Sequence, residues 1–309
     1  MRVISLLLLS LISAGATAKN LNTDRLMSKD TNKDGRLSRE ELGEPFWQRA
    51  AGQDANGDGF LDAMELQALL TRGSRGKVEQ ARPGGANLAF QVREFTATNG
   101  ETLRYSLFIP LERSDTPLPL VLCLHGTGGN TDAANLLASA ERQKQHPCLI
   151  MAPACDGKSA RWAKSEFRGG EGHVVMPELI ETLDAVITET KADRSRIYVT
   201  GQSMGGVGTW GVIAGYPQKF AAAIPVCGIW QAEDAGKMNG VAIWAFHGDQ
   251  DDAVPVTGSR DMIEALKMAG VKPEPKYTEF PGVGHGSWGP AYEKPELWEW
   301  LFAQRIGKP

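Results

Sequence analysis

Ser203 stands at the centre of the segment Gly201–Gly205 (GQSMG), which follows an apolar, strand-like run ending at Thr200. A serine hydroxyl is a weak nucleophile at neutral pH, so it needs a base within reach of its oxygen and backbone N–H groups that stabilise the oxyanion. A sharp strand-to-helix turn offers both, and glycines two positions before and after the serine leave space for that turn. The segment therefore predicts nucleophilic acyl transfer by Ser203.

Candidates for the acid and the base follow downstream. His285 lies between two glycines in a loop after the last strand-like run, where it can meet Ser203. Three carboxylates, Asp249, Asp251 and Asp252, crowd one earlier loop. Only one of them should accept the hydrogen bond from His285 and hold its tautomer, and the residues alone leave that choice open. The chain order serine, aspartate, histidine is that of α/β-hydrolases rather than of chymotrypsin or subtilisin.

A glycine-rich segment, His125–Gly129 (HGTGG), begins where another apolar run ends. Ligands of parallel sheets bind beyond the carboxyl ends of the strands, so this loop should border the same site. We expect the backbone N–H groups of Thr127 and Met204 to form the oxyanion hole, where one donor is worth about 3–4 kcal/mol in the transition state. A plain turn is the alternative for the glycine cluster.

Other residues with polar or aromatic side chains fall near these segments. His125 and His247 each end a strand before a glycine, and we expect them to brace loops. Trp162, Trp230 and Trp288 fall in loops expected near the active face, where an indole stacks on an aromatic acyl group or a sugar ring. Packing in the core is the equal alternative for these tryptophans.

A 12-residue pattern occurs twice ahead of these segments, at 30–41 and 54–65. Each copy has oxygen-bearing side chains at positions 1, 3, 5, 9 and 12, a glycine at position 6 and a backbone carbonyl at position 7, the donors that Ca²⁺ takes. The predicted ligands are Asp30, Asn32, Asp34, Arg36, Ser38, Glu41, Asp54, Asn56, Asp58, Phe60, Asp62 and Glu65. A solvated acidic region would not keep glycine and glutamate in register twice, so we expect two structural calcium sites.

Only residues 42–53 separate the two calcium loops, which is enough for one connecting helix. This spacing predicts a compact all-α unit that stabilises structure rather than a sensor that opens a groove. The following segment, 72–87, is rich in glycine and charge without periodicity and is expected to be a linker. We therefore expect a calcium unit at 19–71 and a catalytic domain at 88–309.

The first 18 residues have the pattern of a secretory signal peptide. Arg2 precedes an apolar run, and Ala16–Ala18 (ATA) resembles a cleavage site. The run is too short to span a bilayer, so we expect a secreted or periplasmic protein without membrane association. The net charge of -4 comes without a basic stripe, which argues against nucleic-acid binding. The pairing of Cys123, Cys148, Cys155 and Cys227 and the oligomeric state stay open.

Beyond residue 90, short apolar runs alternate with helix-compatible stretches such as 174–190. The runs lie at 120–124, 149–152, 197–199, 221–226 and 241–246, and the last strand-like segment is 276–280. An Asn99-Gly100 pair between two alternating segments, 92–98 and 103–109, predicts a hairpin. Such alternation predicts an α/β fold with a mostly parallel sheet covered by helices on both faces.

These segments resemble secreted bacterial α/β-hydrolases of the polyhydroxybutyrate depolymerase, feruloyl esterase and acetyl xylan esterase type. The resemblance covers Phe90 to the C-terminus and lies in Gly201–Trp210, His247–Pro255 (HGDQDDAVP) and Val283–His285. In that family's pattern the catalytic acid corresponds to Asp251, with Asp252 as the alternative. The calcium unit is similar to EF-hand pairs of planctomycete-type secreted enzymes.

The resemblance implies a secreted serine esterase that acts through an acyl-enzyme on carbohydrate-linked or polyester acyl groups, with plant polysaccharide or polyester as the substrate. A serine peptidase of prolyl-oligopeptidase kinship would use the same residues, although this chain lacks the long propeller domain of that group. A catalytically inactive, calcium-dependent binding module is the non-enzymatic alternative.

Overall fold

The computed structural model of this chain describes residues 29–33, 36–44, 47, 59–62, 90–110, 116–127, 129, 132–155, 160–164 and 173–307. The chain divides into two compact units, Met1–Ala81 and Arg82–Pro309. The expected signal peptide and linker lie outside the described residues, as do Asp34, Asp54, Asn56, Asp58 and Glu65 of the calcium loops.

The C-terminal unit is built on an eight-stranded sheet with the order β12-β11-β10-β9-β5-β6-β4-β3. Its strands are β3 Gln91–Thr96, β4 Thr102–Phe108, β5 Leu120–Leu124, β6 Leu149–Ala154, β9 Ile197–Gln202, β10 Ala222–Val226, β11 Ala242–Gly248 and β12 Lys276–Phe280. Only β4 runs against its neighbours, β3 and β6; the other pairs are parallel. The hairpin expected at Asn99-Gly100 is confirmed as β3 and β4.

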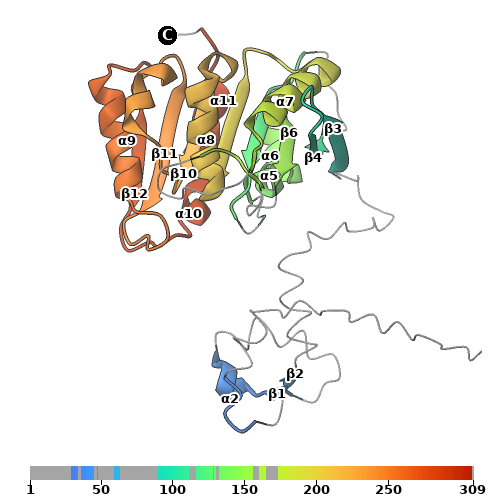
Figure 1. The fold of residues 1–309 in the computed structure, drawn as a ribbon, viewed down its shortest axis with the longest axis vertical. Helices are drawn as coiled ribbons and strands as arrows, with labels where there is room; N and C mark the ends of the chain where they lie inside the picture. The colour runs from blue at the N-terminus through green and yellow to red at the C-terminus, as the bar shows by residue number, and fades with distance from the viewer. Residues whose placement is uncertain are drawn as a thin grey trace, which may run out of the picture. The chain divides into compact units, whose positions relative to one another are not determined.

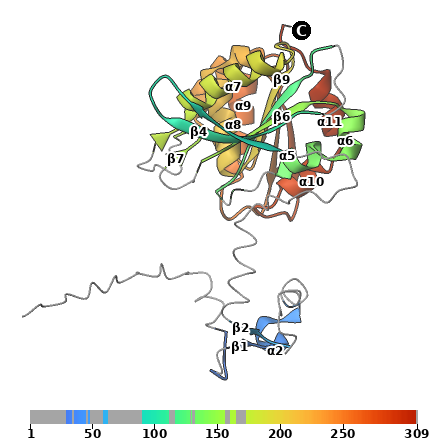
Figure 2. The same ribbon diagram turned by 90° about the vertical axis from the view of Figure 1, so that its right-hand side faces the viewer.

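Helices cover both faces of this sheet, as Figures 1 and 2 show. One face carries α7 Met176–Thr190, α8 Met204–Gly215 and α9 Thr257–Met268; the other carries α5 Asp132–Leu137, α6 Ala140–Gln145, α10 Trp288–Tyr292 and α11 Pro295–Ala303. Two short 3-10 turns, η3 Pro217–Lys219 and η4 Ala232–Met238, follow α8 and β10. The predicted α/β architecture is confirmed.

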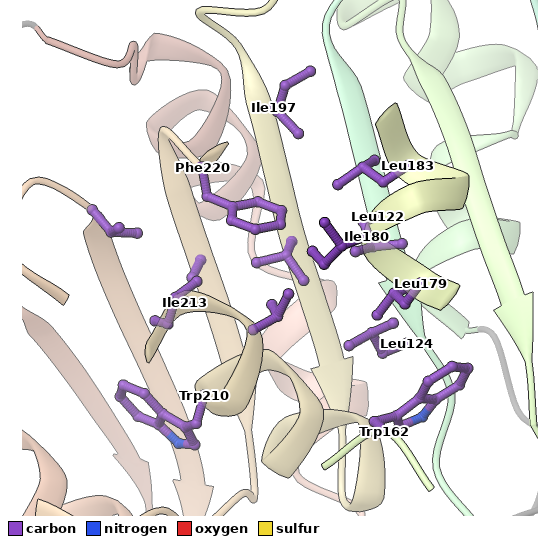
Figure 3. Close-up of a cluster of buried hydrophobic side chains, with 14 of the residues drawn as sticks. Leu122, Leu124, Trp162, Leu179, Ile180, Leu183, Ile197, Trp210, Ile213 and Phe220 are labelled. Carbon is purple, nitrogen blue, oxygen red and sulfur yellow. The ribbon is translucent and has the colours of Figure 1, made fainter. Parts of the chain in front are cut away.

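Two hydrophobic cores result, because successive strand residues point to opposite faces. In β5, Leu122 and Leu124 pack against α7 and α8, whereas Val121 and Cys123 belong to the opposite core. Figure 3 shows the first core, in which Leu179 and Leu183 of α7 face the strands. Each fully buried side chain of this size contributes about 1.5–3 kcal/mol, so the cores hold the strand ends in fixed register.

A small parallel pair, β7 Ala160–Arg161 and β8 His173–Val174, precedes α7. Glu178 in the first turn of α7 is buried, and its Oε1 accepts hydrogen bonds from Asn99 Nδ2 at 2.6 Å and His173 Nε2 at 2.8 Å. This carboxylate therefore ties the β3–β4 hairpin and β8 to the same helix.

The described part of the N-terminal unit contains α2 Arg39–Leu42 and an antiparallel pair, β1 Arg36–Leu37 and β2 Leu61–Asp62. Leu37 and Leu61 occupy position 8 of the two calcium loops, pair with each other and are fully buried. The two loops are thus joined by a short β-ladder, which the expectation of an all-α unit did not include. Within the described residues of the whole chain, no helix is both long and apolar enough to cross a bilayer.

Candidate active site

The turn between β9 and α8 holds Ser203 in a backbone conformation that residues other than glycine rarely adopt, with φ 57° and ψ −117°. Its N–H donates to the Val226 carbonyl of β10 at 3.0 Å. The turn also presses against β5, since a Cβ added at Gly205 would overlap the Leu124 carbonyl. Only glycine fits there, which is the physical reason for the glycine two residues after the serine.

Ser203 is joined to two other residues by a chain of hydrogen bonds. Its Oγ lies 2.8 Å from Nε2 of His285, and Nδ1 of His285 lies 2.8 Å from Oδ2 of Asp251. A carboxylate only accepts, so Nδ1 carries the hydrogen and Nε2 is left to accept from the Ser203 hydroxyl. The structure thus brings together the three side chains that the sequence predicted as nucleophile, base and acid.

Asp251 is fixed from several directions. Its side chain is fully buried, and Oδ1 accepts hydrogen bonds from the N–H groups of Ala253 at 2.9 Å and Val254 at 2.8 Å. Burial raises the pKa of this carboxyl, but the hydrogen bonds from Val254, His285 and Ala253 together outweigh burial and lower the pKa. Asp251 therefore stays ionised beside His285.

The two neighbouring carboxylates do not reach His285. Asp249 accepts a hydrogen bond from the Gly282 N–H at 2.7 Å, and Asp252 is exposed. His247 is buried and contacts the same loop. Its Nδ1 lies 2.8 Å from the Ser259 hydroxyl, and its Nε2 lies 3.0 Å from the Val254 carbonyl. Burial lowers the pKa of His247, which therefore acts as a neutral brace, as expected.

The loop after β5 lies against the nucleophile, since a Cβ added at Gly126 would be 3.5 Å from Cβ of Ser203. His125 Nε2 accepts from the Cys155 N–H at 3.1 Å, so Nδ1 carries the hydrogen and donates to the Gly126 carbonyl at 2.7 Å. In a trans peptide the N–H points opposite to the C=O. The N–H of Thr127 therefore points away from His125, and His125 is the expected loop brace.

Met204, the other predicted oxyanion donor, is the first residue of α8. The N–H groups of the first helical turn have no partner within the helix and lie at the positive end of its dipole. Both predicted donors therefore belong to segments that border Ser203.

The tryptophans behave differently from one another. Trp162 is fully buried, and its Nε1 donates to the His125 carbonyl at 2.9 Å, so the core-packing alternative holds for it. Trp288 is half-buried with its ring edge-on to His285, 5.5 Å between centroids. Trp230 is also half-buried and donates from Nε1 to Asp234 at 2.9 Å. Of the three, Trp288 is the one with a ring contact to a residue of the Ser203–His285–Asp251 chain.

Two contacts at the site were not anticipated from the sequence. Gln202 is buried, and its Nε2 donates to Asp132 at the start of α5 at 2.9 Å, which links the nucleophile strand to the loop after β5. Cys227 follows β10 with φ 39°, and burial raises the pKa of its thiol to about 12. Its sulfur lies within 4.8 Å of ligand atoms of Asp251 and His285. No local pattern marks either residue, because segments far apart in the sequence form these contacts.

The calcium loop that is partly described has a donor set suited to Ca²⁺. Both oxygens of Glu41 turn toward the loop: Oε1 accepts from the N–H and hydroxyl of Thr31, and Oε2 from the N–H and hydroxyl of Ser38, all at 2.9 Å. These bonds, led by that from the Ser38 backbone, lower the pKa of Glu41 to about 2. The side chains of Arg36 and Phe60, at position 7 of each loop, stack on each other at 4.8 Å. The metal ligand expected at this position is the backbone carbonyl oxygen, not the side chain.

The strand order and the β9–α8 turn are those of the α/β-hydrolase fold. Comparison with known proteins agrees. Residues 155–239 match the model of the prolyl oligopeptidase family, and residues 30–47 and 54–70 match the EF-hand model. The crystal structure of a thermostable esterase superposes with a TM-score of 0.64 at 35% identity, over 70% of this chain and 63% of that one.

Two curated relatives are esterases by name. Feruloyl esterase B of Neurospora crassa is 26% identical over 45% of this chain, and "Probable acetylxylan esterase A" of Neosartorya fischeri is 24% identical over 71%. The aligned part spans 48% of the first relative and 61% of the second. The C-terminal unit thus has the α/β-hydrolase fold and is similar to esterases.

Proposed function

We propose that this protein is a secreted serine esterase that hydrolyses carboxylic esters through an acyl-enzyme. The observation that carries the proposal is the hydrogen-bonded chain from Ser203 Oγ through His285 to Asp251, with both distances at 2.8 Å. In this arrangement one group is ready to attack, one to accept its proton and one to orient the acceptor.

Each residue has a defined part in the proposed reaction. Ser203 Oγ attacks the ester carbonyl while its proton passes to Nε2 of His285, and Asp251 stabilises the imidazolium that forms. His285 returns the proton to the leaving alcohol. Water, deprotonated by the same histidine, then releases the acid from Ser203. The N–H groups of Thr127 and Met204 donate to the oxyanion formed at both stages.

For the substrate, we propose acyl groups linked to carbohydrate or built into a polyester. The similarity to a feruloyl esterase and an acetylxylan esterase supports the carbohydrate-linked class. The half-buried ring of Trp288 beside His285 supports an acyl or sugar ring at this place, because an indole offers a flat apolar surface.

We propose that the N-terminal unit binds two structural calcium ions and takes no part in the reaction. The EF-hand matches and the inward-turned Glu41 support this assignment. The oxygens of Asp30, Asn32, Ser38 and Glu41 and the Arg36 carbonyl are the described groups that would hold the ion of the first loop. Export rests on the signal-like pattern of residues 1–18.

A second candidate is a serine peptidase, favoured by the match of 155–239 to the prolyl oligopeptidase model. The same triad would cleave an amide if His285 protonated the leaving amine. A panel of p-nitrophenyl acyl esters, methyl ferulate, acetylated xylan and a chromogenic dipeptide separates the two. We expect ester hydrolysis at rates far above dipeptide cleavage, and the reverse order would favour the peptidase.

Ser203→Ala tests the nucleophile. Because loss of the serine or the histidine of a triad costs about a million-fold in kcat, we expect ester hydrolysis to vanish while the melting temperature changes little. Labelling by a fluorophosphonate probe, which reacts with activated serines, should be lost in parallel. Residual activity above about a tenth of the parent would contradict the assignment, since that corresponds to less than about 1.4 kcal/mol.

A further inference from the structure

Cys227 is a buried thiol that the proposed reaction does not use. Its backbone is held at the end of β10 by a hydrogen bond from its N–H to the Phe246 carbonyl at 2.8 Å. Its sulfur, a ring nitrogen of His285 and a carboxylate oxygen of Asp251 all lie within 4.8 Å of one another. The fully buried hydroxyl of Ser287 lies beside the same sulfur. Three different metal-binding groups thus converge under the nucleophile turn.

The chemistry of this set selects one kind of cation. A thiolate, an imidazole and a carboxylate are ligands of zinc, whereas calcium and magnesium prefer oxygen alone. Tetrahedral zinc with bonds of 2.0–2.3 Å needs ligand atoms about 3.3–3.8 Å apart. Separations of at most 4.8 Å exceed this range by no more than about 1 Å, which side-chain rotation supplies, with a fourth position for water.

We propose that Cys227, Asp251 and His285 form an inhibitory binding site for a thiophilic divalent cation such as Zn²⁺. The cation reaches it from the substrate side, because the His285 side chain is 26% exposed while those of its two partners are buried. Binding itself needs only these three residues, whereas the inhibition rests on the proposed function.

The protons account for the inhibition. Cys227 loses its thiol proton to solvent as the sulfur binds the cation. In the proposed site the cation binds Nδ1 of His285, the nitrogen that faces Asp251. The hydrogen on Nδ1 is therefore displaced to Nε2, and the Asp251 oxygen that accepted it binds the cation instead. Nε2–H then donates toward Ser203 and cannot accept its proton. The cation therefore removes the base from the reaction without occupying the space of the substrate.

The activity test uses the full-length protein in saturating calcium, so that the calcium loops stay filled. We expect Zn²⁺ to lower kcat with little change in KM, and a chelator selective for zinc over calcium to restore it. Cys227→Ala, compared with its own kcat in the absence of Zn²⁺, should need at least about tenfold more Zn²⁺ for half inhibition, since even an outer-shell change costs 10–100-fold in metal affinity. Cys155→Ala, which removes the least buried of the four thiols, should respond like the parent.

A spectroscopic test does not depend on activity. Co²⁺ titrated into the parent and into Ser203→Ala should give a thiolate-to-cobalt charge-transfer band in both, because Ser203 is not a ligand. The band should be absent from Cys227→Ala and persist in Cys155→Ala. A parent without the band, a Cys227→Ala protein that keeps it, or equal zinc inhibition of the two would overturn the site. A parent protein that shows the band but hydrolyses no ester, even without Zn²⁺, would overturn the esterase proposal alone.

Discussion

The Ser203 turn lies in close backbone contact with β5, whereas the side chain of Asp251 is held by hydrogen bonds to its carboxylate. At the turn, Gly205 lies against the Leu124 carbonyl with no room for a side chain. In the acid loop, Asp251 is held by two backbone N–H groups and by His285. A substitution that adds atoms should therefore disrupt the turn. A substitution that changes hydrogen-bonding capacity or charge should disrupt the arrangement around Asp251.

Among the changes that leave Ser203 in place, the largest effect on kcat should come from the hydrogen bonds of Asp251. Asp251→Asn keeps the shape but reverses the hydrogen-bond demand on His285, and we expect kcat to fall about 10⁴-fold through the wrong tautomer. Asp249→Asn and Asp252→Asn are matched controls in the same loop and should change kcat far less. Steady-state kinetics on a p-nitrophenyl ester measures all three. If kcat fell strongly in Asp252→Asn and stayed near the parent value in Asp251→Asn, the acid would be Asp252.

The packed region should fail through stability instead. Gly205→Ala places a methyl group on the Leu124 carbonyl, and because backbone cannot rotate away, we expect a loss of at least about 3 kcal/mol in the free energy of unfolding. Gly215→Ala at the other end of α8 meets nothing within 4 Å and should gain about 0.5–1 kcal/mol. Chemical denaturation compares the two, and equal stabilities would mean that the turn is not close-packed.

Acid should weaken the polar region selectively. The folded pKa of Asp251 is lowered, so its ionised form adds stability above the ordinary pKa of about 3.9, and this contribution is lost as pH falls through the folded pKa. We therefore expect the parent to lose more stability than Asp251→Asn between about pH 6 and pH 3. Urea denaturation at both pH values decides it, and parallel losses would show that Asp251 is not stabilised by its partners.

The smallest expected effect on kcat/KM is that of removing calcium from the N-terminal unit. This change tests whether a part of the chain outside the two regions affects ester hydrolysis. EDTA should lower the protease resistance of the N-terminal unit, because carboxylates in an empty loop repel each other. On a small soluble ester, kcat/KM should change less than about threefold, under roughly 0.7 kcal/mol. Limited proteolysis and kinetics, each with EDTA and with calcium, measure both. A large parallel loss of activity would tie the calcium unit to the site.

The sequence predicted the parts of the molecule that repeat a local pattern. The strand at 120–124 matches the expected run, because continuous apolar residues reflect burial directly. Ser203 and His285 were found because glycines mark tight turns. The roles of Gln202 and Cys227 were not predicted, since each depends on a neighbour from another strand or loop. Choosing among the three aspartates required either family resemblance or the hydrogen bonds themselves.

The backbone of Ser203 has a consequence for selection of heat-resistant variants. A residue other than glycine at φ 57° and ψ −117° costs of order 1–3 kcal/mol, which the packed surroundings must offset. Ser203→Gly relieves that strain, so a library screened only for melting temperature would enrich it although it has no nucleophile. Stability and turnover therefore oppose each other at this one position, and any thermal screen of this chain needs an activity filter.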